Sequence, residues 1–188
     1  APIQLLWLNL ISDGAPALAL GTEKGDPDIM EHPPRPASEP IINKFMVRGI
    51  IVQTIAITAT TLTAFWLGGG ALKGSTAEAR ILSETFAFVT LSLSELFRAY
   101  TARSEYYPLT KIGIFSSKNM NMAVLFSVVL VLLVVYVPFL QVIFDTVSLR
   151  WIEWAEILPL VLIPTIAAEV MKSISYKKHL KDRAAGKV

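Results

Sequence analysis

Cysteine is absent from the 188-residue sequence, which excludes disulfide bonds and metal sites built on thiolates. The two histidines, His32 and His179, lie far apart in polar segments and show no zinc-binding spacing. Charged residues are also scarce, at 17% of the chain against about 25% in an average soluble domain. Hydrophobic residues make up 53% instead, and this balance is typical of a membrane protein.

The hydrophobic residues are gathered into five long segments. A bilayer core of roughly 30 Å requires about 20 residues of helix, and no charge interrupts the sequence from Met120 to Phe144. We therefore predict an all-α fold, a polytopic membrane helix bundle of about five transmembrane helices in one membrane domain over residues 1–188. The predicted helices cover about residues 2–20, 46–67, 79–100, 120–143 and 154–174.

The polar connections carry most of the positive charge. Residues 21–44 hold several prolines, which predicts an extended loop rather than a helix. Most of the 17 Lys and Arg residues fall in or next to this loop, in residues 98–118, and from Lys172 into the basic tail, 177–188. Because cytoplasmic loops attract basic residues, we expect the 21–44 loop and the C-terminus to be cytoplasmic. The expected location is the plasma membrane of a prokaryote. The basic residues then face anionic lipid, and no nucleic-acid partner is expected.

Polar residues inside the first segment are candidates for a cation site. Asn9, Ser12 and Asp13 are spaced to share one face of a helix, and all three offer hard oxygen ligands. Pro16 lacks an N–H group, so the carbonyl of Ser12 loses its usual partner, and Gly14 loosens the backbone further. Interrupted helices line ion sites in many transporters. The alternative is an interhelical hydrogen-bond cluster with a protonated Asp13.

Glu95 is an ionisable residue well inside the third predicted helix, and two roles are open for it. It could be a ligand of a second cation, or it could pair with Arg98, which lies three residues on and on the same face. Glu169 and Lys172 have the same spacing in the fifth helix, and there we expect a structural salt bridge.

Residues 4–21, which read QLLWLNLISDGAPALALG, strongly resemble the sixth transmembrane helix of the type II P-type ATPases. The sequences DPDIM at 26–30 and PPR at 33–35 resemble the loop that follows this helix in those pumps. The resemblance continues more weakly through the other four helices, with SLSE at 92–95 in the position of the eighth helix. It covers nearly the whole chain.

The resemblance implies a role for each matching residue. Asn9, Ser12 and Asp13 match the cation ligands of the sixth helix, and Glu95 matches the eighth-helix glutamate of two-site calcium pumps. Two features depart from that pattern: calcium pumps commonly carry Thr at the position of Ser12, and we do not expect Arg98 beside Glu95. Ca²⁺ is the transported cation that the resemblance implies, and transport of Na⁺, K⁺ or H⁺ within the same family is an alternative.

The sequence contains no Asp-Lys-Thr-Gly phosphorylation motif, no Thr-Gly-Glu motif and no nucleotide-binding domain. The resemblance therefore implies that ATP and Mg²⁺ act only through other domains of a longer parent, and that this chain is inactive by itself and holds no resident cofactor. An opening at Ala1, without a Met, fits a piece of a longer protein. The expected partners are the lipid bilayer, the remaining helices and domains of the pump, and the cation. A stand-alone membrane scaffold or regulatory subunit is the alternative.

Overall fold

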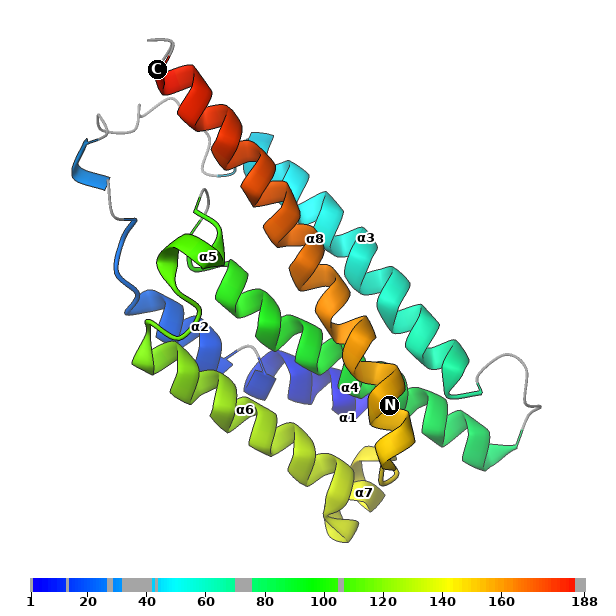
Figure 1. Ribbon diagram of the computed structural model, residues 1–188. Helices are drawn as coiled ribbons and strands as arrows, with labels where there is room; N and C mark the ends of the chain where they lie inside the picture. The colour runs from blue at the N-terminus through cyan, green and yellow to red at the C-terminus, as the bar shows by residue number, and fades with distance from the viewer. Residues whose placement is uncertain are drawn as a thin grey trace.

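The computed structural model of the chain is helical, and the residues that it describes include no strand (Figure 1). The described residues are 2–12, 14–26, 29–31, 42, 44–69, 76–104 and 107–184. In chain order the elements are α1 (Pro2–Trp7), the π-helix η1 (Leu8–Ser12), α2 (Gly14–Gly21), the 3₁₀-helix η2 (Ile29–Glu31), α3 (Lys44–Leu67), α4 (Ala77–Thr101), α5 (Leu109–Ile112), α6 (Lys118–Tyr136), α7 (Pro138–Phe144) and α8 (Trp151–Ala184).

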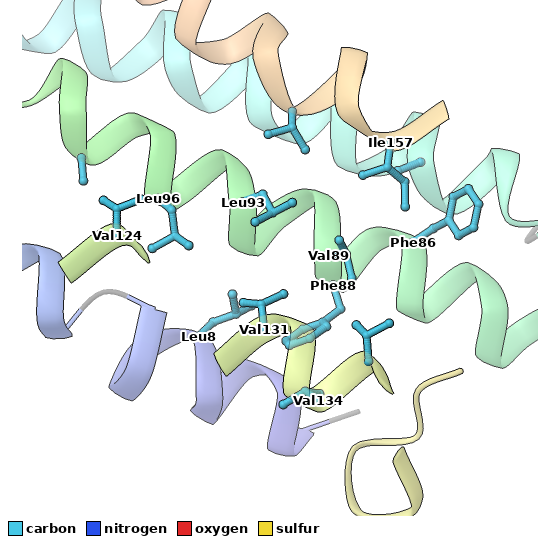
Figure 2. Close-up of a cluster of buried hydrophobic side chains, with 14 of the residues drawn as sticks. Leu8, Phe86, Phe88, Val89, Leu93, Leu96, Val124, Val131, Val134 and Ile157 are labelled. Carbon is cyan, nitrogen blue, oxygen red and sulfur yellow. The ribbon is translucent and has the colours of Figure 1, made fainter. Parts of the chain in front are cut away.

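Helix α4 lies at the centre of the bundle. It contacts α3 and α8 on one side, and α2, η1 and α6 on the other, so two layers of helices enclose it (Figure 1). Figure 2 shows the result: apolar side chains of α4, such as Phe88 and Leu93, meet Leu8 of η1, Val131 of α6 and Ile157 of α8 in one cluster. The close packing of these side chains holds the helices together where lipid offers no hydrophobic driving force.

The serines and threonines of α4 are buried as deeply as its apolar residues. The hydroxyl groups of Ser83, Thr85 and Ser92 donate to the carbonyls of the residues four positions earlier, at 2.7 Å, 2.8 Å and 2.7 Å. Each of these hydroxyls is therefore satisfied within the helix itself. A central helix can carry such residues because its neighbours are protein rather than lipid.

Four helices among the described residues are long and apolar enough to cross a bilayer. They are Pro2–Gly21, Met46–Leu67, Lys118–Tyr136 and Trp151–Tyr176. Helix α4, with 25 residues, has the length but also contains Glu84, Glu95 and Arg98. Its place among the four spans accounts for this composition, and it corresponds to the third of the five predicted helices, over 79–100.

The fourth predicted helix, over 120–143, is two helices in the structure. Helix α6 ends at Tyr136, Val137 is extended with φ −86° and ψ 117°, and Pro138 begins α7. A proline disfavours helical geometry in the residue before it and is itself well suited to the first position of a helix. The fifth predicted helix, over 154–174, differs as well, because α8 begins at Trp151 and continues to Ala184.

Gly68, in the turn after α3, allows the backbones of α3 and α4 to meet. A Cβ atom on Gly68 would lie 2.6 Å from Cα of Ser83. We expect Gly68→Ala to destabilise the bundle by about 1–3 kcal/mol, because backbone must move to relieve the overlap. The matched control is Gly21→Ala, whose Cβ would meet nothing within 4 Å. Thermal unfolding in detergent measures the difference, and equal midpoints for the two variants would contradict the prediction.

Candidate functional site

The first transmembrane segment, α1–η1–α2, is an interrupted helix, which we call the opening helix. Its α-helical hydrogen bonds give way to a π-helix from Leu8 to Ser12, and α-helix resumes at Gly14. Pro16, buried in the first turn of α2, has no N–H group to donate to the preceding turn. π-Helical turns widen the backbone and occur frequently at functional sites. The interruption predicted around Ser12 and Pro16 is therefore present in the backbone.

The first half of the opening helix is fixed to α7. The Gln4 side chain is buried and donates from Nε2 to the carbonyl of Phe144 at 2.7 Å. The Trp7 ring lies edge-on to the Phe144 ring, with centroids 4.9 Å apart and an interplanar angle of 77°. One residue of α7 thus receives two contacts from α1.

The second half is fixed at its far end, just after α2. Glu23 Oε1 accepts a hydrogen bond from Arg103 Nη2 at 2.9 Å, and this ion pair is nearly enclosed, with 2% of the Arg103 side chain and 12% of the Glu23 side chain exposed. The Thr22 hydroxyl accepts from Asn119 Nδ2 of α6 at 3.0 Å. Both halves of the opening helix are therefore held at their outer ends, while the π-helical turn lies between them.

Arg103 also binds the loop that precedes α6, through both of its Nη atoms. Its Nη1 donates to the carbonyls of Gly113 at 2.9 Å and Ile114 at 3.1 Å, and its Nη2 donates to the Ser116 hydroxyl at 2.7 Å. We call Glu23, Arg103, Gly113, Ile114 and Ser116 the Arg103 cluster. A planar guanidinium can hold several acceptors in fixed directions, which suits it to joining separate segments.

Helix α8 holds the segment that carries Arg103. The buried Lys172 donates from Nζ to the carbonyls of Thr101 and Ser104, at the C-terminal end of α4, where a positive charge is stabilised by the helix dipole. Glu169 Oε2 accepts from the backbone N–H of Leu109 at 2.7 Å. Glu169 and Lys172, expected to pair with each other, thus each bind the connection between α4 and α5. These contacts also place the ends of α2, α4 and α8 on one side of the bundle, as the charge pattern requires.

Of the three predicted ligands of the opening helix, the structure describes the side chain of Asn9 alone. Asn9 is exposed on the surface of the described bundle, between Leu6 and Leu10, which are 64% and 67% exposed. Ser12 belongs to the π-helix, but its side chain, like the whole of Asp13, lies outside the described residues. The face that carries Asn9 is therefore open to any helix that packs against α1.

Glu95 lies in a different setting. Its Oε2 is 3.4 Å from Nε of Arg98, so the ion pair that was one of its two expected roles is formed. The pair lines a small cleft of about 210 Å³ between α3 and α4, together with Gln53, Thr54 and Thr58. No residue of α1 or η1 lines this cleft, and among the described residues no three His, Cys, Asp or Glu side chains converge as a metal site would require.

The residues that fix the opening helix were not found from the sequence. Arg103 was counted only as one of many basic residues of a polar loop, and its burial depends on acceptors at 113–116 and on Glu23, which is 80 positions earlier. A usable signal was the position of Glu23, the first charged residue after the opening helix.

Interrupted spans with polar residues at the break recur in membrane transport proteins. Comparison with known proteins defines the class further, because residues 1–174 match the family described as "Cation transporting ATPase, C-terminus". The chain belongs to this family, as the C-terminal membrane region of a type II P-type ATPase.

Individual relatives agree with the family. The chain is 34% identical to calcium-transporting ATPase 1 of Bacillus cereus, over 91% of its own length and 20% of that protein. It is 33% identical to calcium-transporting ATPase type 2C member 1 of Mus musculus, over 98% and 20%, and 33% identical to calcium-transporting ATPase 1 of Lactococcus lactis, over 94% and 20%. The chain thus spans about a fifth of the length of the curated relatives that it matches.

The Glu23–Arg103 pair makes stability depend on pH. Burial alone would raise the pKa of Glu23, but hydrogen bonds from Arg103 and Ser117 and the charge of Arg103 outweigh it, so this pKa lies below its ordinary value. A lowered pKa gives stabilisation that is complete above the ordinary value of about 4.3 and is lost as the pH falls through the folded-state value.

We expect Glu23→Gln to lower the free energy of unfolding by about 2 kcal/mol at pH 7, because Arg103 stays buried without its counter-charge. The difference from the wild type should shrink as the pH falls below the ordinary pKa of about 4.3, and it should vanish below the lowered folded-state pKa, where Glu23 is neutral in both states. Thermal unfolding in detergent from pH 7 to pH 3 measures it. Glu84→Gln is the control, since its partner Arg80 is 78% exposed. A difference that stays constant down to pH 3 would refute this account.

Proposed function

We propose that this chain is the membrane portion of an ATP-driven cation pump, that it supplies part of the intramembrane cation site and a supporting helix bundle, and that the cation is Ca²⁺. The observation that carries the proposal is the π-helical turn of the opening helix. Asn9 and Ser12 lie in this turn and Asp13 directly follows it, in a helix held at both ends.

The chemistry of these residues supports a hard cation. Ca²⁺ takes six to eight oxygen ligands in a flexible arrangement, including carboxylates, amides and backbone carbonyls. Asn9 provides an amide, Ser12 a hydroxyl and Asp13 a carboxylate, and Pro16 leaves the carbonyl of Ser12 without its helical donor. Three side chains and one carbonyl are fewer than the ion needs. The open face around Asn9 suits further helices of a longer parent, which would provide the remaining ligands.

ATP and Mg²⁺ would act in this proposal through domains that this chain does not contain. The 21–44 loop, with its Pro33-Pro34-Arg35 sequence, would contact the phosphorylation domain. That role requires the end of the bundle that carries the Arg103 cluster to face the cytoplasm, and the basic residues of the C-terminal tail support the same orientation. We also propose the plasma membrane of a prokaryote, although the bacterial and mammalian relatives match the chain at similar identity.

Asp13 provides the direct test. In the full-length protein that carries this chain, we expect Asp13→Asn to abolish Ca²⁺-dependent phosphorylation by ATP, because it removes the only carboxylate of the opening helix. The control is Asp145→Asn, the same chemical change at an exposed residue after α7 whose positive φ of 49° Asn also tolerates. Phosphorylation assays with Ca²⁺ and with Na⁺ identify the ion. Unchanged transport by Asp13→Asn would refute the proposal.

Glu95 is proposed as a further ligand, which requires it to leave Arg98 when the cation binds. We expect Glu95→Gln to weaken Ca²⁺ binding about tenfold, equivalent to roughly 1.4 kcal/mol. Glu84→Gln is the matched control, because Glu84 lies on the same helix and pairs with Arg80 at 3.1 Å. Equilibrium binding of radioactive Ca²⁺ distinguishes the two roles. If Glu95→Gln binds Ca²⁺ as the wild type does, Glu95 is only the partner of Arg98.

A further inference from the structure

We infer that Arg103 is a positioning residue for the cation site: through Glu23 it fixes the end of α2, and thereby the place of Gly14 at the start of that helix, the next residue in sequence after the proposed ligand Asp13. Arg103 itself is not one of the proposed ligands. The inference rests on the proposed function, and it assigns to this residue a role in cation affinity that neither its charge nor its place in a polar loop indicates.

The first step is the enclosure of the Arg103 cluster. Four hydrogen bonds from one guanidinium join Glu23 to Gly113, Ile114 and Ser116, at distances from 2.7 to 3.1 Å. Because 2% of the Arg103 side chain is exposed, moving Glu23 away would leave a nearly buried charge without its counter-charge, which is costly. Glu23 therefore has one strongly preferred position relative to the loop.

The second step is transmission along α2. Only Thr22 separates Glu23 from the last residue of α2, and the carbonyls of Ala19 and Leu20 accept from the N–H groups of Thr22 and Glu23 at 3.1 Å. The eight residues of α2 form a rigid rod about 12 Å long. A shift of Glu23 therefore moves Gly14, next to the proposed ligand Asp13, rather than being absorbed on the way.

The third step is that α8 holds the segment after α4 that carries Arg103. Lys172 of α8 binds the carbonyls of Thr101 and Ser104 on either side of Arg103, and Glu169 binds the N–H of Leu109. The contacts thus lead from Lys172 of α8 to the segment that carries Arg103, and from Arg103 to Glu23 at the end of α2. The first half of the opening helix is held separately, by Phe144. Relative movement of the two halves is therefore concentrated in the π-helical turn, where the proposed ligands lie.

The test measures cation dependence in the full-length protein. We expect Arg103→Gln and Glu23→Gln to raise the Ca²⁺ concentration for half-maximal phosphorylation by roughly 3- to 30-fold, the range of couplings carried by residues without ligand contact. The maximal level per folded molecule should change little. Arg103→Lys, which keeps the charge and some donors, should give a smaller shift. In the double variant of Arg103→Gln and Glu23→Gln, the half-maximal Ca²⁺ concentration should rise no more than in the stronger single variant, because both changes break the same contact.

A purely structural role predicts a different pattern, with less folded protein and an unchanged half-maximal Ca²⁺ concentration. The control is Arg80→Gln, which breaks the exposed pair with Glu84 and should leave that concentration unchanged. If Arg103→Gln fails to fold, the test uses Glu23→Gln and Arg103→Lys. A half-maximal Ca²⁺ concentration equal to that of the wild type in both variants would overturn the inference. A wild-type protein without any cation dependence would instead refute the proposed function, and the inference with it.

Discussion

Every backbone N–H and C=O group that lies in the hydrocarbon core of a bilayer must find a partner within the protein, because lipid provides none. The opening helix departs from regular α-helix within its span, at the π-helical turn and at Pro16. Such a departure is stable only where protein surrounds it. Leu8, in the π-helical turn, is packed into the core beside α4 and α6, and this contact keeps one side of the turn out of lipid (Figure 2).

The same constraint explains the composition of α4. A helix exposed to lipid could not carry buried serines and threonines along with Glu95 and Arg98 at low cost. Enclosed by other helices, α4 satisfies the hydroxyls of Ser83 and Ser92 on its own carbonyls and pairs Glu95 with Arg98. Its central position lets the polar residues that a cation site needs exist without exposing them to hydrocarbon. The surrounding helices thus provide the polar residues of α4 with the protein environment that lipid cannot provide.

The long apolar segments were predictable because length and absence of charge suffice to identify a span, and α3, α6 and α8 follow this rule. The break at Pro138 was missed because the residues on both sides are apolar, so the hydrophobic run hid a change of direction. The end of α8 was misplaced because the boundary of the membrane was taken for the boundary of the helix, and basic residues favour helix as well. For the candidate site, the sequence allowed the types and the spacing of the possible ligands to be predicted. The burial of Arg103 was not predictable, since it depends on contacts between distant segments.

The contact between Gly68 and Ser83 has a consequence for the depth of the charged pair. Glu95 lies twelve positions after Ser83 on α4, which corresponds to roughly 18 Å along the helix axis. The backbone contact at Ser83 therefore fixes the position of α4 along its axis and its rotation about that axis, and so fixes the depth and direction of Glu95. A single residue inserted between the two would turn Glu95 by about 100° and carry it away from Gln53 and Thr54, with no change in composition.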